Sequence, residues 1–261
     1  MDATLWIAKT GLDAQQTRMS VISNNLANVN TMGFKRDRAV FEDLLYQNVR
    51  QAGSITAANA EAPTGLMLGT GTRIVATEKL HTQGNMVSTE NALDVAIDGA
   101  GYFQVLRADS TIGYTRDGSF KISSEGALVT ANGYRLQPEI TIPSDAQSIT
   151  IGADGTVSVM QYGQTAPTTI GNIQIATFVN PAGLQAVGEN MYLENGASGA
   201  PQLLTPTQTG AGKLVQGALE ASNVNVVEEM VNMIETQRAY EVNSKAISAA
   251  DQMLKFVNQN L

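Results

Sequence analysis

The sequence predicts an α+β protein with discontinuous N- and C-terminal coiled-coil helices and a central antiparallel β-rich domain. Both ends of the 261-residue chain carry apolar residues spaced seven apart, which is the spacing of a coiled-coil seam. The long stretch between them lacks this period and consists of short strand-like runs separated by glycine-containing turns. We expect the two terminal helices to pair with each other and with copies from neighbouring chains.

The first helix is expected to run from about residue 4 to residue 29. Its seam consists of apolar residues that recur along one face, namely Leu5, Leu12, Met19, Ile22 and Leu26. Asn28, Asn30 and Gly33 follow, and these residue types tolerate the left-handed backbone that closes a helix. A short apolar segment completes a predicted domain of residues 1–45, which pairs with the C-terminal helix.

Residues 46–73 differ in composition from the helix before them and are rich in Gly, Ala and Thr. Gly53, Pro63, Gly65 and Gly69 punctuate this stretch. One interpretation is a disordered loop. The other is an extended arm that becomes ordered against neighbouring subunits, and the sequence leaves both open.

Residues 74–214 are expected to form a β-rich outer domain. Turn signals recur in it at short intervals, at Asp117-Gly118, Glu125-Gly126, Asn132-Gly133 and Asp154-Gly155. This spacing indicates antiparallel hairpins in a sandwich or a partial barrel.

Residues 215–261 are expected to carry the C-terminal helix and to complete the inner helical domain. Asn225 is a predicted N-cap, and Glu228 follows three residues later, as in a capping box. No Gly or Pro follows Gly217, so we expect the helix to continue to near the end of the chain. Its seam again has the seven-residue spacing, with Met233, Tyr240, Ile247, Leu254 and Leu261.

An amphipathic helix at a chain end can also be part of the core of its own domain. Here the seams are narrow, and a narrow seam buries little apolar surface against the cost of ordering a whole helix. We therefore expect the helices to become fully ordered only when neighbouring subunits cover them.

Composition excludes several classes of protein. The net charge is -8 and no stripe of Lys or Arg is present, which argues against nucleic acid as a partner. The chain has no cysteine, which excludes disulfides and thiolate metal sites. No apolar run is long enough for a membrane span, and the first residues lack the features of a cleavable signal peptide. The protein is expected to be cytoplasmic or to be exported by a route that does not require a cleavable signal peptide.

The sequence offers no catalytic, metal-binding or cofactor-binding constellation. His81 is the sole histidine, and we expect a solvated or hydrogen-bonded surface role for it rather than catalysis. Gly99-Ala100-Gly101 contains a GxG pattern but lies between two predicted strands, whereas a phosphate-binding loop precedes a helix. A carbohydrate-active enzyme would need paired carboxylates and an aromatic platform, yet the single Trp6 lies in the terminal helix. We predict that the protein is not an enzyme and has no cofactor.

Four blocks of the sequence resemble the flagellar basal-body rod and hook family, in the order that the family shows. They are residues 23–35, 93–103, 114–136 and 217–245. The residues that match the N-terminal and C-terminal signatures are Asn25, Asn28, Thr31, Gly33, Phe34, Lys35, Asn223, Asn225, Gln237, Arg238 and Tyr240. Within the family, the chain is most similar to distal rod subunits, because it is too short for the outer domain of hook proteins and carries the Gly/Ala/Thr-rich insertion.

The resemblance implies a structural subunit that polymerises helically into the hollow, rigid drive shaft of the distal rod. Such a shaft transmits torque from the motor to the hook through the P and L rings. Implied partners are further copies of the chain, proximal rod proteins, the hook protein, the P- and L-ring proteins and the flagellar type III export apparatus. The implied location is the basal body, from the periplasm to the outer membrane. Alternatives are a hook or proximal rod subunit of the same family, or a secreted surface or adhesin protein.

Overall fold

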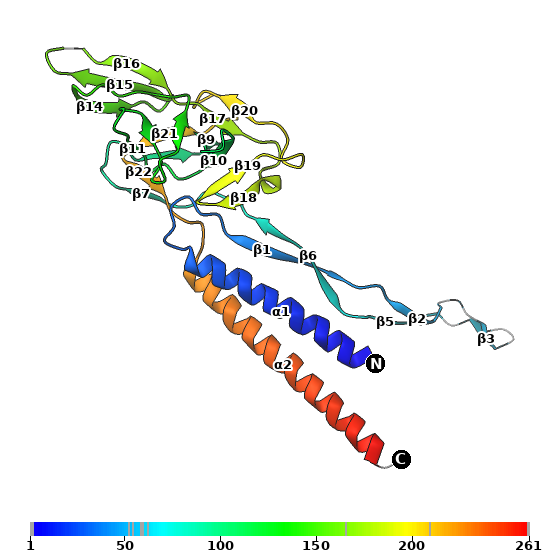
Figure 1. Ribbon diagram of the computed structural model, residues 1–261. Helices are drawn as coiled ribbons and strands as arrows, with labels where there is room; N and C mark the ends of the chain where they lie inside the picture. The colour runs from blue at the N-terminus through cyan, green and yellow to red at the C-terminus, as the bar shows by residue number, and fades with distance from the viewer. Residues whose placement is uncertain are drawn as a thin grey trace. The chain divides into compact units, whose positions relative to one another are not determined.

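The computed structural model (Figure 1) describes residues 3–259 apart from residues 52, 54, 58, 59, 62, 165 and 209. The chain divides into two compact units. The helical unit comprises Met1–Ala27, Asp37–Glu78 and Asn225–Leu261, and the β unit comprises Asn28–Arg36 and Lys79–Val224. The predicted α+β class is confirmed, with a helix near each end of the chain and an antiparallel β-rich centre.

Helix α1 spans Ala3–Ala27 and helix α2 spans Val226–Gln259. The side chain of Asn225 caps α2, because its Oδ1 accepts hydrogen bonds from the backbone N–H groups of Val227 at 3.1 Å and Glu228 at 3.4 Å. Glu228 and Glu229 lie in the first turn, where the helix dipole favours negative charge. Among the described residues, no helix is long and apolar enough to cross a membrane.

The two helices lie side by side and run antiparallel (Figure 1). Arg18 of α1 donates to the side chain of Asn232, and a Cβ added at Gly11 would lie 3.0 Å from Nδ2 of Asn243, so the helices approach closely there. With 34 residues, α2 is longer than the 25-residue α1 and continues beyond its N-terminus.

A β ribbon completes the helical unit. β1 (Asp37–Asp43) pairs with β6 (Thr72–Lys79), β2 (Gln47–Arg50) with β5 (Leu66–Leu68), and β3 (Ile55–Ala57) with β4 (Ala60–Glu61). The ribbon packs against α1 at Gly71, where an added Cβ would lie 2.2 Å from Oγ1 of Thr10. The segment predicted as a loop or an arm is therefore a hairpin where the structure describes it.

The β unit contains a nine-stranded antiparallel sheet. Its order is β11-β12-β13-β9-β10-β19-β18, with β17 also paired to β9 and β20 paired to β17. The strands are β9 (Tyr102–Leu106), β10 (Ile112–Thr115), β11 (Lys121–Ile122), β12 (Leu128–Val129), β13 (Arg135–Gln137), β17 (Ile175–Thr177), β18 (Gln185–Gly188), β19 (Met191–Leu193) and β20 (Gln202–Leu204). A short 3-10 helix, Pro181–Gly183, precedes β18.

Smaller antiparallel sheets accompany this one. β14 (Ala146–Ile151), β15 (Thr156–Gln161) and β16 (Thr168–Asn172) form a three-stranded sheet. β8 (Val95–Asp98) pairs with β21 (Lys213–Gln216), and β7 (Met86–Ser88) pairs with β22 (Ala218–Glu220). The last two pairs join residues that are far apart in the sequence, so the segment before α2 belongs to the β unit.

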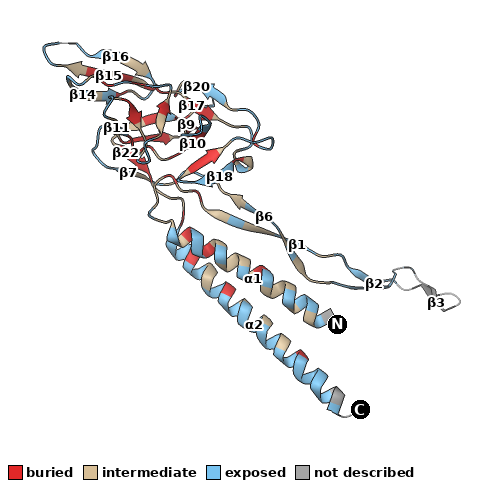
Figure 2. Ribbon diagram, viewed as in Figure 1, coloured by how far each residue is buried: buried red, intermediate tan, exposed pale blue. Residues whose placement is uncertain are grey.

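Buried residues concentrate in the β unit (Figure 2). Its main core is built from aliphatic residues of β8, β12, β13, β14, β15, β17 and β21. Phe103 of β9 belongs to it as well and lies in edge-to-face contact with Phe120, at 5.1 Å between ring centroids. A second cluster contains Tyr102, Tyr114 and Tyr192. Of the signature residues, those between 28 and 35 and Asn223 belong to this unit.

Signature-residue junction and candidate assembly surfaces

Asn25 ties the end of α1 to the start of the β ribbon. Its side-chain amide donates to the backbone oxygen of Asp37 at 2.9 Å, and its Oδ1 accepts from the backbone N–H of Asp37 at 2.8 Å. It also donates to Oε1 of Glu229 on α2 at 3.4 Å. Asn25 is buried, so these bonds satisfy an amide that would be costly to leave without partners.

Asn28, Thr31 and Phe34 shape the turn that follows α1. The hydroxyl of Thr31 donates to Oδ1 of Asn28 at 3.2 Å, and the backbone N–H of Phe34 bonds the oxygen of Thr31. The ring of Phe34 lies 5.0 Å from the ammonium group of Lys79, which is within the range of a cation–π contact. These residues therefore have local structural roles.

Gly33 allows a close approach between two segments of the β unit. Its φ is +69°, and an added Cβ would lie 2.7 Å from the backbone N of Asp117 and 2.8 Å from the carbonyl carbon of Arg116. Its N–H donates to the backbone oxygen of Glu220 at 2.8 Å. Only glycine meets both the left-handed backbone and the limited space.

Lys35, Glu220 and Arg116 form a charged cluster that is almost fully buried. Lys35 and Glu220 are each 1% exposed and Arg116 is 5% exposed. Nζ of Lys35 lies 2.6 Å from Oε1 of Glu220, and Nε of Arg116 lies 3.0 Å from Oε2. The second contact is an ion pair without hydrogen-bond alignment, and Oε2 has no hydrogen bond from any described residue.

Backbone groups satisfy most of the remaining bonding capacity of this cluster. Lys35 also donates to the oxygen of Thr82 at 2.7 Å, and the N–H of Gly84 donates to Oε1 of Glu220 at 2.8 Å. Burial lowers the pKa of Lys35, and the nearby guanidinium of Arg116 lowers it further, while Glu220 acts in the opposite direction. Two cations thus share one carboxylate inside the protein.

Asn223 connects the segment before α2 to two other segments. Its Oδ1 accepts from the backbone N–H of Arg36 at 2.8 Å, and its amide donates to the oxygens of Leu80 at 2.8 Å and Thr82 at 3.1 Å. Side chains from both signatures, Lys35 and Asn223, therefore bind the same stretch at residues 80–82. Arg116 and Glu220 are functional residues that no motif or spacing in the sequence indicated. The sequence signal for Glu220 is a lone charge between apolar and small residues, whereas Arg116 lies next to Asp117 and carries no such signal.

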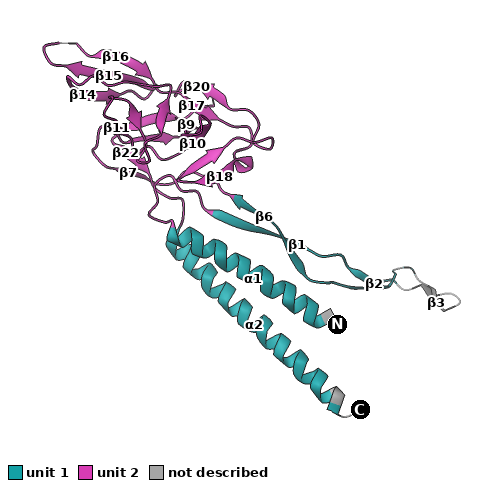
Figure 3. Cartoon of the chain, in the orientation of Figure 1, with its two compact units in different colours: residues 1–27, 37–78, 225–261 teal, residues 28–36, 79–224 magenta. Residues whose placement is uncertain are grey.

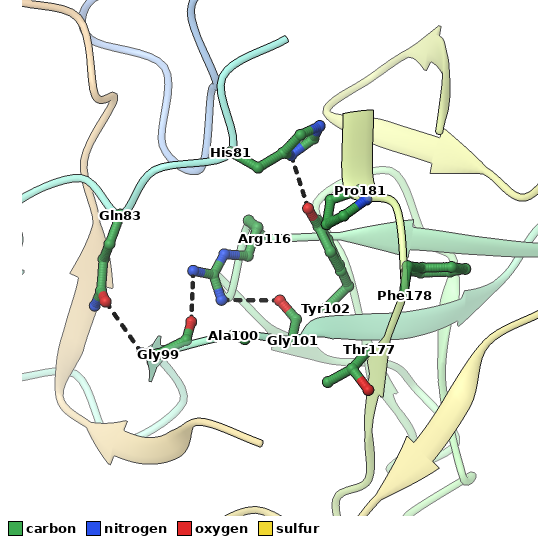
Figure 4. A pocket seen from close by; sticks show the side chains of 10 residues that line it. All are labelled: His81, Gln83, Gly99, Ala100, Gly101, Tyr102, Arg116, Thr177, Phe178 and Pro181. Carbon is green, nitrogen blue, oxygen red and sulfur yellow. Dashed lines mark hydrogen bonds between the residues drawn. The ribbon is translucent and has the colours of Figure 1, made fainter. Parts of the chain in front are cut away.

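A hollow of about 200 Å³ lies beside the cluster (Figure 4). Arg116 lines it and donates to the backbone oxygens of Gly99 and Gly101, both at 2.8 Å. Nδ1 of His81 lies 2.7 Å from the hydroxyl of Tyr102. Burial lowers the pKa of His81 to about 4, and the charges of Lys35, Lys79 and Arg116 contribute. No group of three or more potential metal ligands occurs among the described residues.

The predicted seam of α1 is only partly buried in the single chain. Ile22 is buried, whereas Leu5, Leu12, Met19 and Leu26 are half-buried. On α2, Met233 and Ile247 are half-buried, Tyr240 is 46% exposed and Leu254 is 37% exposed; Leu261 lies outside the described residues. The single chain therefore leaves part of both predicted seams uncovered.

Polar and small residues occupy the contact face of α2 instead. Glu229, Thr236 and Ala250 are buried, and Asn243 lies between them at the same seven-residue spacing. This set is displaced by three or four positions from the predicted apolar seam. Gln237 and Arg238 of the family signature are exposed on α2.

A further group of apolar side chains on α2 is exposed. It consists of Val227, Met230, Val231 and Ile234, each about half exposed or more. At 100° per residue, these positions lie on the side of α2 opposite Thr236. The described part of the chain leaves about half or more of each side chain accessible.

The arm also presents apolar side chains to solvent. Leu45 is 90% exposed, and Tyr46, Val49 and Met67 are more than half exposed. Of the residues singled out in the sequence, Gly53 has a φ of +80°, Pro63 and Gly69 are exposed, and Gly65 is half-buried. Single exposed apolar residues are common on proteins, but a run of them along one narrow ribbon is typical of an interaction surface.

Comparison with known families gives matches in three parts of the chain. A model of the flagella basal body rod protein matches residues 5–35, and a model of the flagellar hook protein FlgE/F/G D1 domain matches residues 96–159. A model of the flagellar basal body rod FlgEFG protein C-terminal region matches residues 215–260. These matches include both helices and much of the β unit, so they place the chain in the class of flagellar rod and hook subunits.

Relatives match the chain along nearly its whole length. The flagellar basal-body rod protein FlgG of Buchnera aphidicola subsp. Acyrthosiphon pisum (strain APS) is 56% identical over 99% of this chain and 100% of its own. FlgG of Borreliella burgdorferi is 48% identical over 99% of this chain and 98% of its own. The flagellar hook-basal body complex protein FlhP of Bacillus subtilis is 31% identical over 96% of each chain. The chain belongs to the FlgG family of flagellar basal-body rod proteins.

Proposed function

We propose that this chain is a structural subunit of the bacterial flagellar distal rod. Copies polymerise helically through their terminal helices into a hollow, rigid shaft, which transmits torque from the motor to the hook through the P and L rings. The observation that carries the proposal is the 56% identity to a flagellar rod protein over 99% of the chain.

The surfaces of the single chain support polymerisation as its mode of action. Both helices leave apolar residues of their predicted seams uncovered, and a further apolar group lies on the outer side of α2. Burial of such side chains against other copies is favourable by about 25 cal/mol per Å² of apolar surface. Repeated head-to-tail contacts do not close into a ring unless the rotation allows it, so they generate a filament.

The proposal includes the surroundings of the shaft. The partners are proximal rod proteins at one end and the hook protein at the other, with the P- and L-ring proteins around the shaft. The protein lies in the basal body between the periplasm and the outer membrane, and the flagellar type III apparatus exports it without cleavage of a signal peptide.

The arm has its own part in this proposal. Its exposed apolar side chains pack on adjacent subunits and lock their relative positions, which favours a stiff shaft over a bendable one. Gly and Pro suit this role, because Gly allows unusual backbone conformations and Pro limits the conformational freedom that is lost on docking.

Electron microscopy of purified basal bodies tests the function. A strain that lacks the gene should produce basal bodies without the distal part of the rod, and expression of this chain should restore that part. A deletion strain with an intact rod but no hook would assign the chain to the hook. A deletion strain that lacks the whole rod would assign it to the proximal rod, and either result would contradict the proposal.

A further inference from the structure

The chain passes between its two units four times. It leaves the helical unit after residues 27 and 78 and leaves the β unit after residues 36 and 224 (Figure 3). On the side of the β unit, the passages lie in three segments, which are residues 28–36, the stretch that begins at residue 79, and the stretch that ends at residue 224. These three segments carry the covalent connections between the two units.

Backbone hydrogen bonds connect the three segments to one another. The N–H of Gly33 donates to the oxygen of Glu220 at 2.8 Å, and the N–H of Leu80 donates to the oxygen of Arg36 at 2.9 Å. The N–H of Ala221 donates to the oxygen of Asn85 at 2.8 Å. The side chain of Asn223 adds bonds to both other segments. The three segments are therefore in contact inside the β unit.

The buried charges lie at the point where these segments meet. Lys35 comes from the first segment and Glu220 from the last, whereas Thr82 and Gly84 of the middle segment supply a backbone oxygen and an N–H. Arg116 follows β10 and is itself held by the oxygens of Gly99 and Gly101. Each charge has its partners only when every segment is in this register.

The charged cluster is better suited to fixing the register of the three segments than to stabilising the β unit. Two cations share one carboxylate, and charges that leave water lose hydration that such a pair recovers only in part. An apolar core of similar volume would tolerate small shifts of one segment past another. A charge that shifts by one residue loses its partner inside the protein, which is much less favourable. The cluster therefore disfavours every register except one.

We propose that Lys35, Arg116 and Glu220 form a clasp, which holds residues 28–36 and 217–224 in one register against residues 79–84. The clasp fixes the place where the chain enters and leaves the β unit. This inference concerns the single chain and does not depend on the proposed role in the rod.

Distance measurements between two spin labels on the isolated full chain test the clasp. The chain has no cysteine, so labels can be attached to Asn30→Cys in the first segment and Ser124→Cys in a turn of the β unit, both of which are exposed. Lys35→Met removes one cation and leaves the balanced pair of Arg116 and Glu220. We expect a broader and shifted distance distribution in this variant, with the unfolding transition of the β unit retained.

Lys213→Met is the matched control, because it removes an ion pair of the same unit, with Asp98 at 3.1 Å, that is exposed on both sides. This control should leave the distribution as narrow as in the parent protein. Glu220→Gln should broaden it further than Lys35→Met, since it leaves both cations without their carboxylate. A lower unfolding midpoint with an unchanged, narrow distribution in Lys35→Met would overturn the proposal. Loss of folding of the whole β unit in Lys35→Met would overturn it as well.

Discussion

At the scale of single residues, the signature glycine has a role that depends on both backbone and space. Gly33 adopts a φ of +69° and lies against the backbone of Arg116 and Asp117. Gly133 has a similar φ of +86°, but an added Cβ there would meet nothing within 4 Å. Alanine substitutions at these two glycines therefore distinguish the free-energy cost of the left-handed backbone from the additional cost of a steric clash.

We predict that Gly33→Ala lowers the free energy of unfolding by more than about 2 kcal/mol, since it adds a backbone clash to the left-handed conformation. Gly133→Ala should lower it by about 1 kcal/mol, because only the conformation is unfavourable. Urea denaturation of both variants measures the difference. Equal losses in the two variants would show that the segment at residue 33 moves away without cost.

His81 is predicted to make the stability of the β unit depend on pH. Its folded-state pKa of about 4 lies below the usual histidine value of 6.5, so the unfolded chain binds more protons between these values. Stability is therefore fully present above about pH 6.5, falls as the pH decreases, and levels off below about pH 4. The full loss is about 3 kcal/mol, from 1.36 kcal/mol for each pKa unit.

The comparison of the parent protein with His81→Gln isolates this contribution from the titration of carboxylates. Gln keeps a group that can bond the hydroxyl of Tyr102 but does not titrate. Urea midpoints measured from pH 7 to pH 4 should fall more steeply in the parent protein than in the variant. Parallel curves would mean that His81 keeps its ordinary pKa in the folded protein.

At the scale of the elements, the two helices combine a polar contact face with uncovered apolar residues. The seven-residue period predicted that the helices exist, but it did not identify which face of α2 contacts α1. The period predicted the face of α2 that carries Ile247 and the rest of the apolar seam. In the single chain, Glu229, Thr236 and Ala250 are buried on the face that contacts α1 instead. An apolar period cannot distinguish contacts within one chain from contacts between copies, because both bury the same residue types.

We predict that Ile247→Asp combined with Leu254→Asp prevents rod formation and leaves the unfolding transition of the β unit nearly unchanged. Leu254 is 37% exposed in the single chain, so a charge at this position becomes buried only where another copy covers the helix. Ser248→Asp with Gln252→Asp adds the same charge at neighbouring exposed positions and should be tolerated. Motility and electron microscopy report assembly. Loss of the β transition in the first variant would assign the seam to the core of that unit.

The arm is predicted to stiffen the assembled shaft. Replacement of residues 47–69 by Asn-Gly keeps β1 and β6 and closes the ribbon with a two-residue turn. Rods should still form through the helices but should be curved or flexible in electron micrographs of basal bodies. Gln47→Ser, at an exposed polar position of the same hairpin, should leave the rods straight. Straight rods of normal length after the replacement would contradict the prediction and show that the arm has no mechanical role.

At the scale of the whole molecule, local sequence signals predicted the elements better than the contacts between them. The N-cap at Asn225 and the glycine turns at Gly126, Gly133 and Gly155 are local features, and the structure contains them. Asp117-Gly118 was predicted as a hairpin turn, but Gly118 instead permits close contact with the backbone oxygen of Val95, where an added Cβ would lie 1.7 Å away. A glycine alone does not reveal which of these two reasons applies.

The charged cluster illustrates what the sequence could not supply. Lys35, Arg116 and Glu220 are distant in the chain, and their meeting depends on the pairing of β7 with β22 and of β8 with β21. These pairings join strands from opposite ends of the β unit. No local pattern encodes such a contact, so the family resemblance pointed to the right blocks without explaining why their residues occur together.

Amide hydrogen exchange, compared between the isolated chain and purified basal bodies, tests most directly whether the terminal helices are assembly elements. In a verified monomer we expect fast exchange across residues 3–27 and 226–259 and slow exchange in the core strands of the β unit. In basal bodies both helices should become strongly protected, with little change in the β core. Strong and equal protection of the helices in both samples would contradict the account.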